Sequence, residues 1–309
     1  MKLAMVFPGQ GSQSVGMLKA YAGLPEIQAV RAQAAEALGA DFVRLLDDGP
    51  AEALNQTINT QPAMVTAGYA AYRAWRALGG PAPELAAGHS LGEYTALTAA
   101  GALAFADTLP LVHFRAQAMQ EAVPQGQGAM AAVLHLDDEH VMAACAEAGG
   151  VVQAVNFNAP GQVVIAGEKT AVERAIEKCK ARGAKRAMPL PVSAPFHSTL
   201  MQPAAERLKG HIQNVRMATP QFAVVNNVDV KMERDPARIK EALVRQAASP
   251  VRWVETIRKM VESGATHIIE CGPGRVLAGM TRRIAPQVQS LTLHDRASLE
   301  AALQALKGA

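Results

Sequence analysis

Short apolar runs alternate with Ala-rich segments of helical periodicity through the first part of the chain. The apolar run at 2–7 ends at the glycine-rich turn 8–12, which predicts a buried strand and then a sharp turn. A second short strand is expected around 84–87, and it leads into an Ala- and Leu-rich helix. Helices are also expected over 62–78 and 105–123, where apolar residues recur three and four positions apart. Strands that alternate with helices predict an α/β fold.

The pattern changes after the Pro- and Gly-rich stretch 124–128. The following segments have strand-like or helix-like periodicity in the order strand, helix, strand, strand, helix, strand. They are 129–136, 138–148, 151–157, 162–166, 169–182 and 185–192. This βαββαβ order is typical of a ferredoxin-like unit. We therefore predict a small ferredoxin-like subdomain at 126–192.

Segments like those of the first part return beyond this subdomain. Helices are expected over 199–213, 235–247, 253–263 and 275–284, and strands over 222–228 and 266–270. The sequence thus predicts a discontinuous larger domain, 1–125 with 193–309. Its functional loops should follow the carboxyl ends of its strands.

Composition supports a well-packed soluble protein and argues against several function classes. Apolar residues make up 50% of the chain and charged residues 18%, which is enough for a large core. The net charge is only +3, and the basic residues form no long run, so we expect no nucleic-acid surface. Three cysteines without paired spacing argue against disulfides and against a metal site. No stretch approaches the ~20 apolar residues of a membrane span, so we expect a cytoplasmic protein that does not bind membranes.

The run Gly88-His89-Ser90-Leu91-Gly92 has the Gly-x-Ser-x-Gly pattern of a nucleophile elbow. Glycines allow the sharp turn because they have no Cβ atom at the crowded positions. Such a turn presents the Ser90 hydroxyl, and the amide of Leu91 points the same way and can bind an oxyanion. The pentapeptide by itself is weak support, since ordinary strand–helix turns contain the same residue types.

A second glycine-rich turn, Gly9-Gln10-Gly11, follows the first expected strand. It lacks the Gly-Lys-Ser/Thr of a phosphate-binding P-loop. One hypothesis is that the amide of Gln10 completes an oxyanion hole with that of Leu91, because hydrolase-type sites take the second amide from another strand–helix loop. The alternative is an ordinary tight turn.

A serine nucleophile needs a base, and His197 is the best positional candidate among the eight histidines. It lies in a loop between the expected subdomain and the next helix. No Asp or Glu between Ser90 and His197 ends an expected strand of the larger domain. A backbone carbonyl could orient the imidazole instead. The alternative is that His197 only packs or caps the following helix.

Arg115 lies within a largely apolar helical run after the elbow. A guanidinium in such a place must reach solvent or bind an anion, and it can grip a carboxylate through two hydrogen bonds. The functional hypothesis is a substrate that carries a carboxylate. The alternative is a salt bridge to a neighbouring helix.

Together, eight segments resemble the malonyl-CoA:acyl-carrier-protein transacylases of type II fatty acid synthesis. They are FPGQGSQ at 7–13, GHSLGEY at 88–94, RAQAMQEAVPQGQGAMAAVL at 115–134, NFNAPGQVVIAG at 156–167, PFHS at 195–198, VNNVDV at 225–230, ALVRQ at 242–246 and GPGRVL at 272–277. The resemblance is collinear and runs nearly from end to end. Each motif is weak alone, whereas the ordered set is specific.

The resemblance implies an α/β-hydrolase-like domain with a ferredoxin-like insertion, and it implies a role for each matching residue. Ser90 would carry the malonyl group, with His197 as general base and then general acid. The carbonyl of Gln246 would orient His197, and Arg115 would bind the malonyl carboxylate. The other implied positions are the oxyanion-hole amides of Gln10 and Leu91, the cleft residues Asn156 and Asn158, and Phe196, which would tune acyl size.

The implied reaction transfers malonyl from malonyl-CoA to the phosphopantetheine thiol of an acyl carrier protein. No cofactor is expected, because malonyl-CoA is a substrate and the partner carries the phosphopantetheine. Three rival hypotheses remain: a trans-acting polyketide acyltransferase, a serine esterase or thioesterase, and a non-catalytic module that binds carrier proteins. The joint presence of Ser90, His197 and Arg115 favours catalysis over simple binding.

Overall fold

A computed structural model describes residues 1–192 and 194–307. Residues 193 and 308–309, which the expected larger domain includes, lie outside the described residues. Parallel strands in the order β7-β2-β1-β8-β9 form one sheet. They are β1 (Leu3–Phe7), β2 (Leu85–Gly88), β7 (Ala223–Val225), β8 (His267–Cys271) and β9 (Gln289–Leu293). The expected α/β architecture is therefore confirmed.

Helices cover both faces of the parallel sheet. They are η1 (Met17–Tyr21), α1 (Pro25–Leu38), α2 (Ala40–Asp48), α3 (Ala51–Leu54), α4 (Thr57–Ala77), α5 (Gly92–Ala99), α6 (Phe105–Glu121), η2 (Thr199–Met201), α9 (Gln202–Ile212), α10 (Pro236–Gln246), α11 (Trp253–Glu262), α12 (Val276–Ile284) and α13 (Arg296–Lys307). Side chains alternate across β1, so Met5 and Phe7 pack with α1 and α4, whereas Ala4 and Val6 pack with α11 and α12. This alternation gives three layers, helices, sheet and helices, with an apolar core on each face of the sheet.

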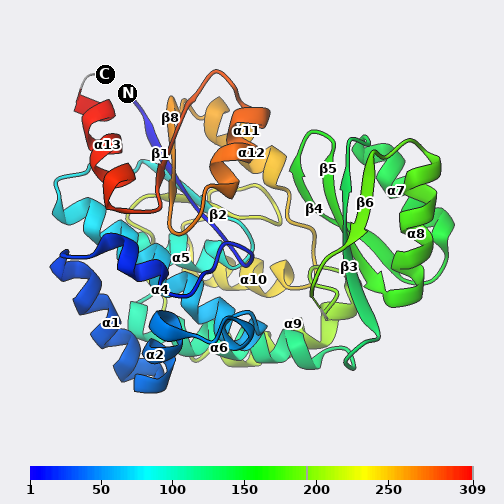
Figure 1. The fold of residues 1–309 in the computed structure, drawn as a ribbon, viewed down its shortest axis with the longest axis horizontal. Helices are drawn as coiled ribbons and strands as arrows, with labels where there is room; N and C mark the ends of the chain where they lie inside the picture. The colour runs from blue at the N-terminus through cyan, green and yellow to red at the C-terminus, as the bar shows by residue number, and fades with distance from the viewer. Residues whose placement is uncertain (193, 308–309) are drawn as a thin grey trace.

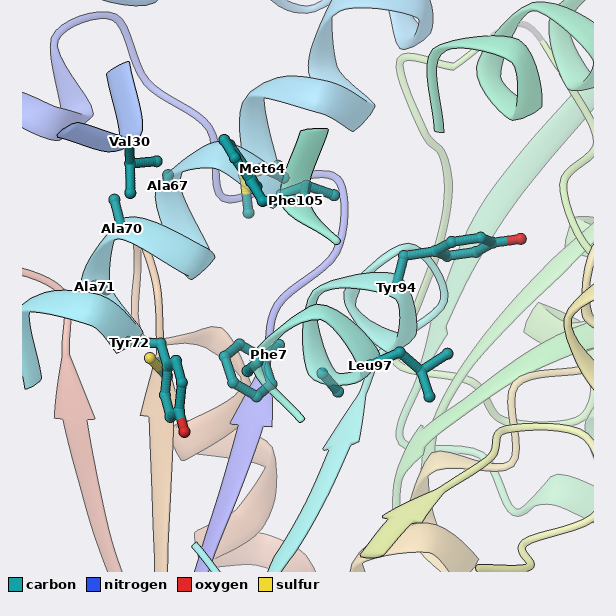
Figure 2. Packing of buried hydrophobic residues seen from close by; sticks show 14 of the residues in the cluster. Phe7, Val30, Met64, Ala67, Ala70, Ala71, Tyr72, Tyr94, Leu97 and Phe105 are labelled. Atoms are coloured by element: carbon teal, nitrogen blue, oxygen red, sulfur yellow. The ribbon is translucent and has the colours of Figure 1, made fainter. Parts of the chain in front are cut away.

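Phe7 lies at the carboxyl end of β1, where the core meets the loops (Figure 2). Its ring is fully buried and packs edge-on against Tyr72 of α4, with ring centroids 6.4 Å apart. The ring of Tyr94, on α5, points away from Phe7 in the same view. Burial of a phenylalanine side chain contributes about 1.5–3 kcal/mol, so this packing fixes the strand end from which the next loop departs.

A second, antiparallel sheet has the strand order β4-β5-β3-β6 and lies to one side of the first sheet (Figure 1). Its elements are β3 (Gly128–Leu134), α7 (Asp138–Ala148), β4 (Val152–Ala159), β5 (Gln162–Glu168), α8 (Lys169–Ala181) and β6 (Arg186–Pro189). Helices α7 and α8 pack on one face, against residues such as Val133 and Ile165. The other face packs Met130 and Val164 against Met119 of α6. This second contact joins the two sheets through an apolar layer beside the candidate site.

Two expectations about individual elements are wrong, and two elements were missed. The strand expected over 222–228 ends at Val225, because the following Asn227 turns its side chain into the loop network described below. The helix expected from residue 62 begins at Thr57, and it contains Pro62 in its second turn. A proline there removes one helical hydrogen bond, and the burial of nearly the whole helix outweighs that loss. Strand β9 and helix α13 were not predicted. None of the described helices is both long and apolar enough to cross a membrane.

Candidate active site

Ser90 stands on a tight turn between β2 and α5, at the carboxyl end of the parallel sheet. Its φ angle is +50°, in the left-handed region that residues other than glycine rarely adopt. A Cβ atom on Gly88 would lie 1.8 Å from the carbonyl carbon of Gly92, and one on Gly92 would lie 2.0 Å from the carbonyl oxygen of Phe7. Both positions therefore require glycine because the backbone segments touch.

The Ser90 hydroxyl and His197 form a hydrogen-bonded pair. Ser90 Oγ lies 2.6 Å from His197 Nε2, and His197 Nδ1 lies 2.8 Å from the backbone carbonyl oxygen of Gln246. A carbonyl oxygen only accepts, so Nδ1 carries the proton of the neutral ring. Nε2 is then free to accept from the serine. The imidazole is thus oriented by a carbonyl, without a carboxylate.

Burial keeps His197 neutral. The side chain is deeply buried, and burial together with the nearby Arg115 charge lowers the pKa of His197 from its usual 6.5 to about 3. The hydrogen bond from Nδ1 to Gln246 opposes this shift and is outweighed. A neutral imidazole at physiological pH is the form that can take a proton from serine.

We therefore expect His197 to stay neutral when the pH is lowered from 8 to 5. In the unfolded chain the same ring titrates near 6.5, so the unfolded state binds the proton first. The free energy of unfolding should consequently fall as the pH drops from about 6.5 towards 3. Nuclear magnetic resonance of ¹⁵N-labelled histidine checks the ionisation directly. A His197 midpoint between pH 6 and 7 would contradict the expectation, and exposed histidines provide the internal control.

Arg115 projects from α6 into the same site and is almost fully buried. Its Nη2 donates to Ser90 Oγ at 3.2 Å and to Gln246 Oε1 at 2.9 Å, and its Nη1 donates to Gln61 Oε1 at 2.8 Å. Its guanidinium also lies over the Tyr94 ring, 5.4 Å from the centroid. Among the described residues it forms no ion pair, so the alternative of an interhelical salt bridge is wrong. A buried cation paired only with neutral groups is well placed to receive an anion.

Behind the serine lies a polar network that the sequence did not reveal. Asn227 Oδ1 accepts from the amide of Ser90 at 2.7 Å, and its Nδ2 donates to the carbonyl of Gly88 at 2.8 Å. The carboxylate of Glu93 accepts from Gln246 Nε2 at 2.8 Å and from the amide of Asn227 at 3.0 Å. Glu93 follows the elbow and Asn227 follows β7, and only the fold brings them together. The only sequence feature that could have indicated this network is the pair Asn226-Asn227 directly after β7.

The amides of Gln10 and Leu91 remain without acceptors among the described residues. The loop after β1 approaches the elbow so closely that a Cβ on Gly9 would lie 2.6 Å from the carbonyl oxygen of His89. Gln10 and Leu91 also line the cavity of about 130 Å³ that contains Ser90. The two turns therefore lie together, and Phe196, Met119 and Met130 form much of the apolar wall of this cavity.

The two asparagines of β4 occupy different places. Asn156 lines the cavity with Ser90, and its buried side-chain oxygen has no partner among the described residues. Asn158 does not line the cavity. Its Oδ1 lies 2.7 Å from Nε2 of His89, whose ring lies 5.3 Å from that of Trp253. Asn158 thus holds the residue before the serine, a contact that the sequence did not suggest.

A larger groove of about 550 Å³ adjoins the cavity, with Gln10 and Val192 in the walls of both. The remaining lining is mainly amide and hydroxyl side chains, with Glu52 and Glu121 as its charged members. This groove could guide a long neutral chain toward Ser90. The residues described here contain no cluster of His, Cys, Asp or Glu that could hold a metal ion.

Comparisons with known proteins agree with this geometry. A family model for the acyl transferase domain matches residues 4–294. The malonyl CoA-acyl carrier protein transacylase of Salmonella typhimurium is 52% identical over 305 residues, which cover 98% of this chain and 99% of the relative. A crystal structure of the acyl-carrier-protein S-malonyltransferase from Burkholderia pseudomallei is 59% identical, with a TM-score of 0.97 over 98% of this chain and 100% of that one.

A third relative is a malonyl-transacylase solved in complex with a type II PKS acyl-carrier protein. It is 50% identical, and its TM-score is 0.96 over 98% of this chain and 99% of that chain. The residues matched by the family model include every residue of the site, from Gln10 to Gln246. The chain belongs to the acyl transferase family, among the malonyl-CoA:acyl carrier protein transacylases.

Proposed function

We propose that this protein transfers the malonyl group from malonyl-CoA to the phosphopantetheine thiol of an acyl carrier protein, through a malonyl ester on Ser90. One observation carries the proposal. Ser90 Oγ lies 2.6 Å from the nitrogen of a neutral imidazole and 3.2 Å from a buried guanidinium. A nucleophile, its base and a group that binds carboxylates thus meet at a single atom.

In the first half-reaction, His197 takes the proton of Ser90 as Oγ attacks the thioester carbonyl. The amides of Gln10 and Leu91 would hold the oxyanion, a contribution of about 3 kcal/mol for each donor. The C–S bond then breaks, and His197 returns the proton to the thiolate of CoA. The Gln246 carbonyl stabilises the imidazolium that forms between these steps.

In the second half-reaction the same groups work in the reverse direction. The thiol of the carrier protein gives its proton to His197, and its sulfur attacks the ester carbonyl. The C–O bond to Ser90 breaks, and the serine recovers its proton. Two successive transfers through one serine predict ping-pong kinetics.

The malonyl carboxylate would bind Arg115 during both steps. Nη2 already points at Ser90 Oγ, and the Nε of the guanidinium has no partner among the described residues. The cavity of about 130 Å³ suits a short acyl group, and Phe196 closes part of it. Asn156 would contact the substrate from the antiparallel sheet, whereas Asn158 would act through His89.

The finer architecture belongs to the same proposal. The βαββαβ order and the sheet order β4-β5-β3-β6 support a ferredoxin-like subdomain at 126–192 within an α/β-hydrolase-like domain, 1–125 with 193–309. The elbow between β2 and α5 supports the hydrolase-like assignment. We further propose that the protein needs no cofactor and works in the cytoplasm, where it binds neither nucleic acid nor membrane.

Mixing the protein with malonyl-CoA, without carrier protein, should add one malonyl group to Ser90. The reason is that the first half-reaction needs only the acyl donor. Intact-mass measurement followed by peptide mapping identifies the modified residue, and Ser90→Ala should remain unmodified. Adduct formation on another residue, or none in the active protein, would rule out the serine ester.

A polyketide role is the second candidate, because the relative with a type II PKS carrier protein is 50% identical to this chain. Competing carrier proteins from fatty acid and polyketide systems at equal concentration should reveal the preferred acceptor. Omitting both carrier proteins from the assay separates transfer from hydrolysis. An esterase or thioesterase would then still release free malonate, whereas a transferase would not.

A further inference from the structure

Glu93 is a buried carboxylate directly behind the reacting groups, and the mechanism above does not use it. Its side chain is 2% exposed on α5. Oε2 accepts from Gln246 Nε2 at 2.8 Å and from the backbone amide of Asn227 at 3.0 Å. A carboxylate without a salt bridge is costly to bury. Its position between two segments of the site therefore calls for a functional reason.

The contact with Gln246 fixes which way the amide of that residue points. An ionised carboxylate only accepts, so it must face the NH₂ group of the amide. The amide oxygen then faces the opposite way, where Arg115 Nη2 donates to it at 2.9 Å. Because a carboxylate accepts and a guanidinium donates, the Gln246 amide donates to Glu93 and accepts from Arg115. Together with the Ser90 carbonyl, which also accepts from Gln246 Nε2, Glu93 thereby holds the amide in the orientation that faces its oxygen to Arg115.

The contact with Asn227 reaches the nucleophile by a second route. Asn227 holds both the amide of Ser90 and the carbonyl of Gly88 through its side chain. Gln246 Nε2 also donates to the carbonyl of Ser90 at 3.0 Å. The strained turn, with Ser90 at a φ of +50°, is thus tied to Glu93 through two intermediates.

We propose that Glu93 is a positioning residue that orients the Gln246 amide, and through it Arg115, so that the site prefers acyl groups with a carboxylate. This inference rests on the proposed malonyl transfer. The remaining charged groups that act on Glu93 are Arg115 and Asp229. Burial raises the pKa of Glu93 to about 7, as expected for a carboxyl group held away from water.

The test replaces Glu93 by glutamine, which keeps the shape and removes the charge. An amide at position 93 removes the charge-assisted bond from Gln246 Nε2 and can present NH₂ to it instead, so the Gln246 amide is held less firmly in the orientation that faces its oxygen to Arg115. We expect kcat/KM for malonyl-CoA to fall about tenfold or more, and the malonyl-to-acetyl ratio of kcat/KM to fall about tenfold. The transfer of both groups is followed with purified carrier protein.

Glu270→Gln is the matched control. Glu270 is also fully buried, its pKa is likewise raised to about 7, and its Oε2 accepts from the amide of Ala278 at the start of α12. The same chemical change there should leave the malonyl-to-acetyl ratio unchanged. A Glu93→Gln variant that loses both activities equally, in proportion to lost folded protein, would overturn the proposal.

A second pair of variants tests the route through the amide, even if Glu93→Gln folds poorly. Gln246→Met keeps the backbone carbonyl that orients His197 and removes the side-chain amide. It should reproduce the loss of selectivity, and adding Glu93→Gln to it should cost little more. Unchanged selectivity in Gln246→Met overturns the proposal. Failure of the wild-type protein to transfer malonyl at all would instead refute the proposed function.

Discussion

His197→Ala should reduce kcat/KM for malonyl transfer about 10⁴- to 10⁶-fold, the range found when a serine nucleophile loses its base. The alanine cannot accept the Ser90 proton, and no other described imidazole contacts Ser90 Oγ. His89, the adjacent residue in the sequence, is held by Asn158. A stopped-flow assay of CoA release in the presence of carrier protein measures the loss.

His211→Ala is the control for this prediction. His211 stacks on Phe114, with ring centroids 3.9 Å apart, and it lies on α9 away from the cavity. Its replacement should leave the rate within about twofold, because surface substitutions away from such a site are usually mild. A loss below tenfold in His197→Ala, with the folded fraction unchanged, would exclude His197 as the base.

The sequence predicted the reacting groups because their chemistry constrains the local pattern. Only glycine fits two positions before and two positions after Ser90, so five consecutive residues are enough to identify the elbow. His197 could be singled out by its loop position alone. The absence of a suitable acid between Ser90 and His197 pointed to a carbonyl, and the resemblance named Gln246, whose carbonyl lies 2.8 Å from Nδ1.

The supporting network could not be predicted because its members are polar residues that only the fold brings together. Asn227 contacts Ser90 across 137 positions of sequence, and Glu93 contacts Gln246 across 153. No periodicity signals such pairs. Asn158 illustrates the same limit, since its β4 position was expected to face the cleft and it instead holds His89.

The fold was predictable to a similar degree. The apolar runs located β1, β2 and β8, which lie at the centre of the parallel sheet. Strand β9 was not predicted because most of its residues are polar and half-buried or exposed, as expected for an edge strand. The start of α4 at Thr57 was also not predicted. Pro62 favours a helix start at that position, and burial of the helix against the core overrides this preference.

Arg115→Ala should abolish the preference for malonyl over acetyl groups. The guanidinium would offer a malonyl carboxylate two charge-assisted hydrogen bonds inside a buried site, where each contributes about 1.5–3 kcal/mol. Acetyl-CoA lacks the carboxylate and loses nothing of this kind. We therefore expect kcat/KM for malonyl-CoA to fall about 100-fold or more, and that for acetyl-CoA to change much less. Competition between the two donors measures the ratio within one sample.

Arg115→Lys separates charge from geometry at the same position. Lysine keeps a positive charge but presents a single ammonium group, which cannot reach Gln61 and Gln246 in the forked manner of the guanidinium. Selectivity in this variant should lie between those of the wild type and the alanine variant.

Equal loss of malonyl and acetyl transfer in Arg115→Ala would mean that the guanidinium only supports Ser90 and Gln246. An unchanged ratio would place the malonyl carboxylate away from Arg115, elsewhere in the cavity.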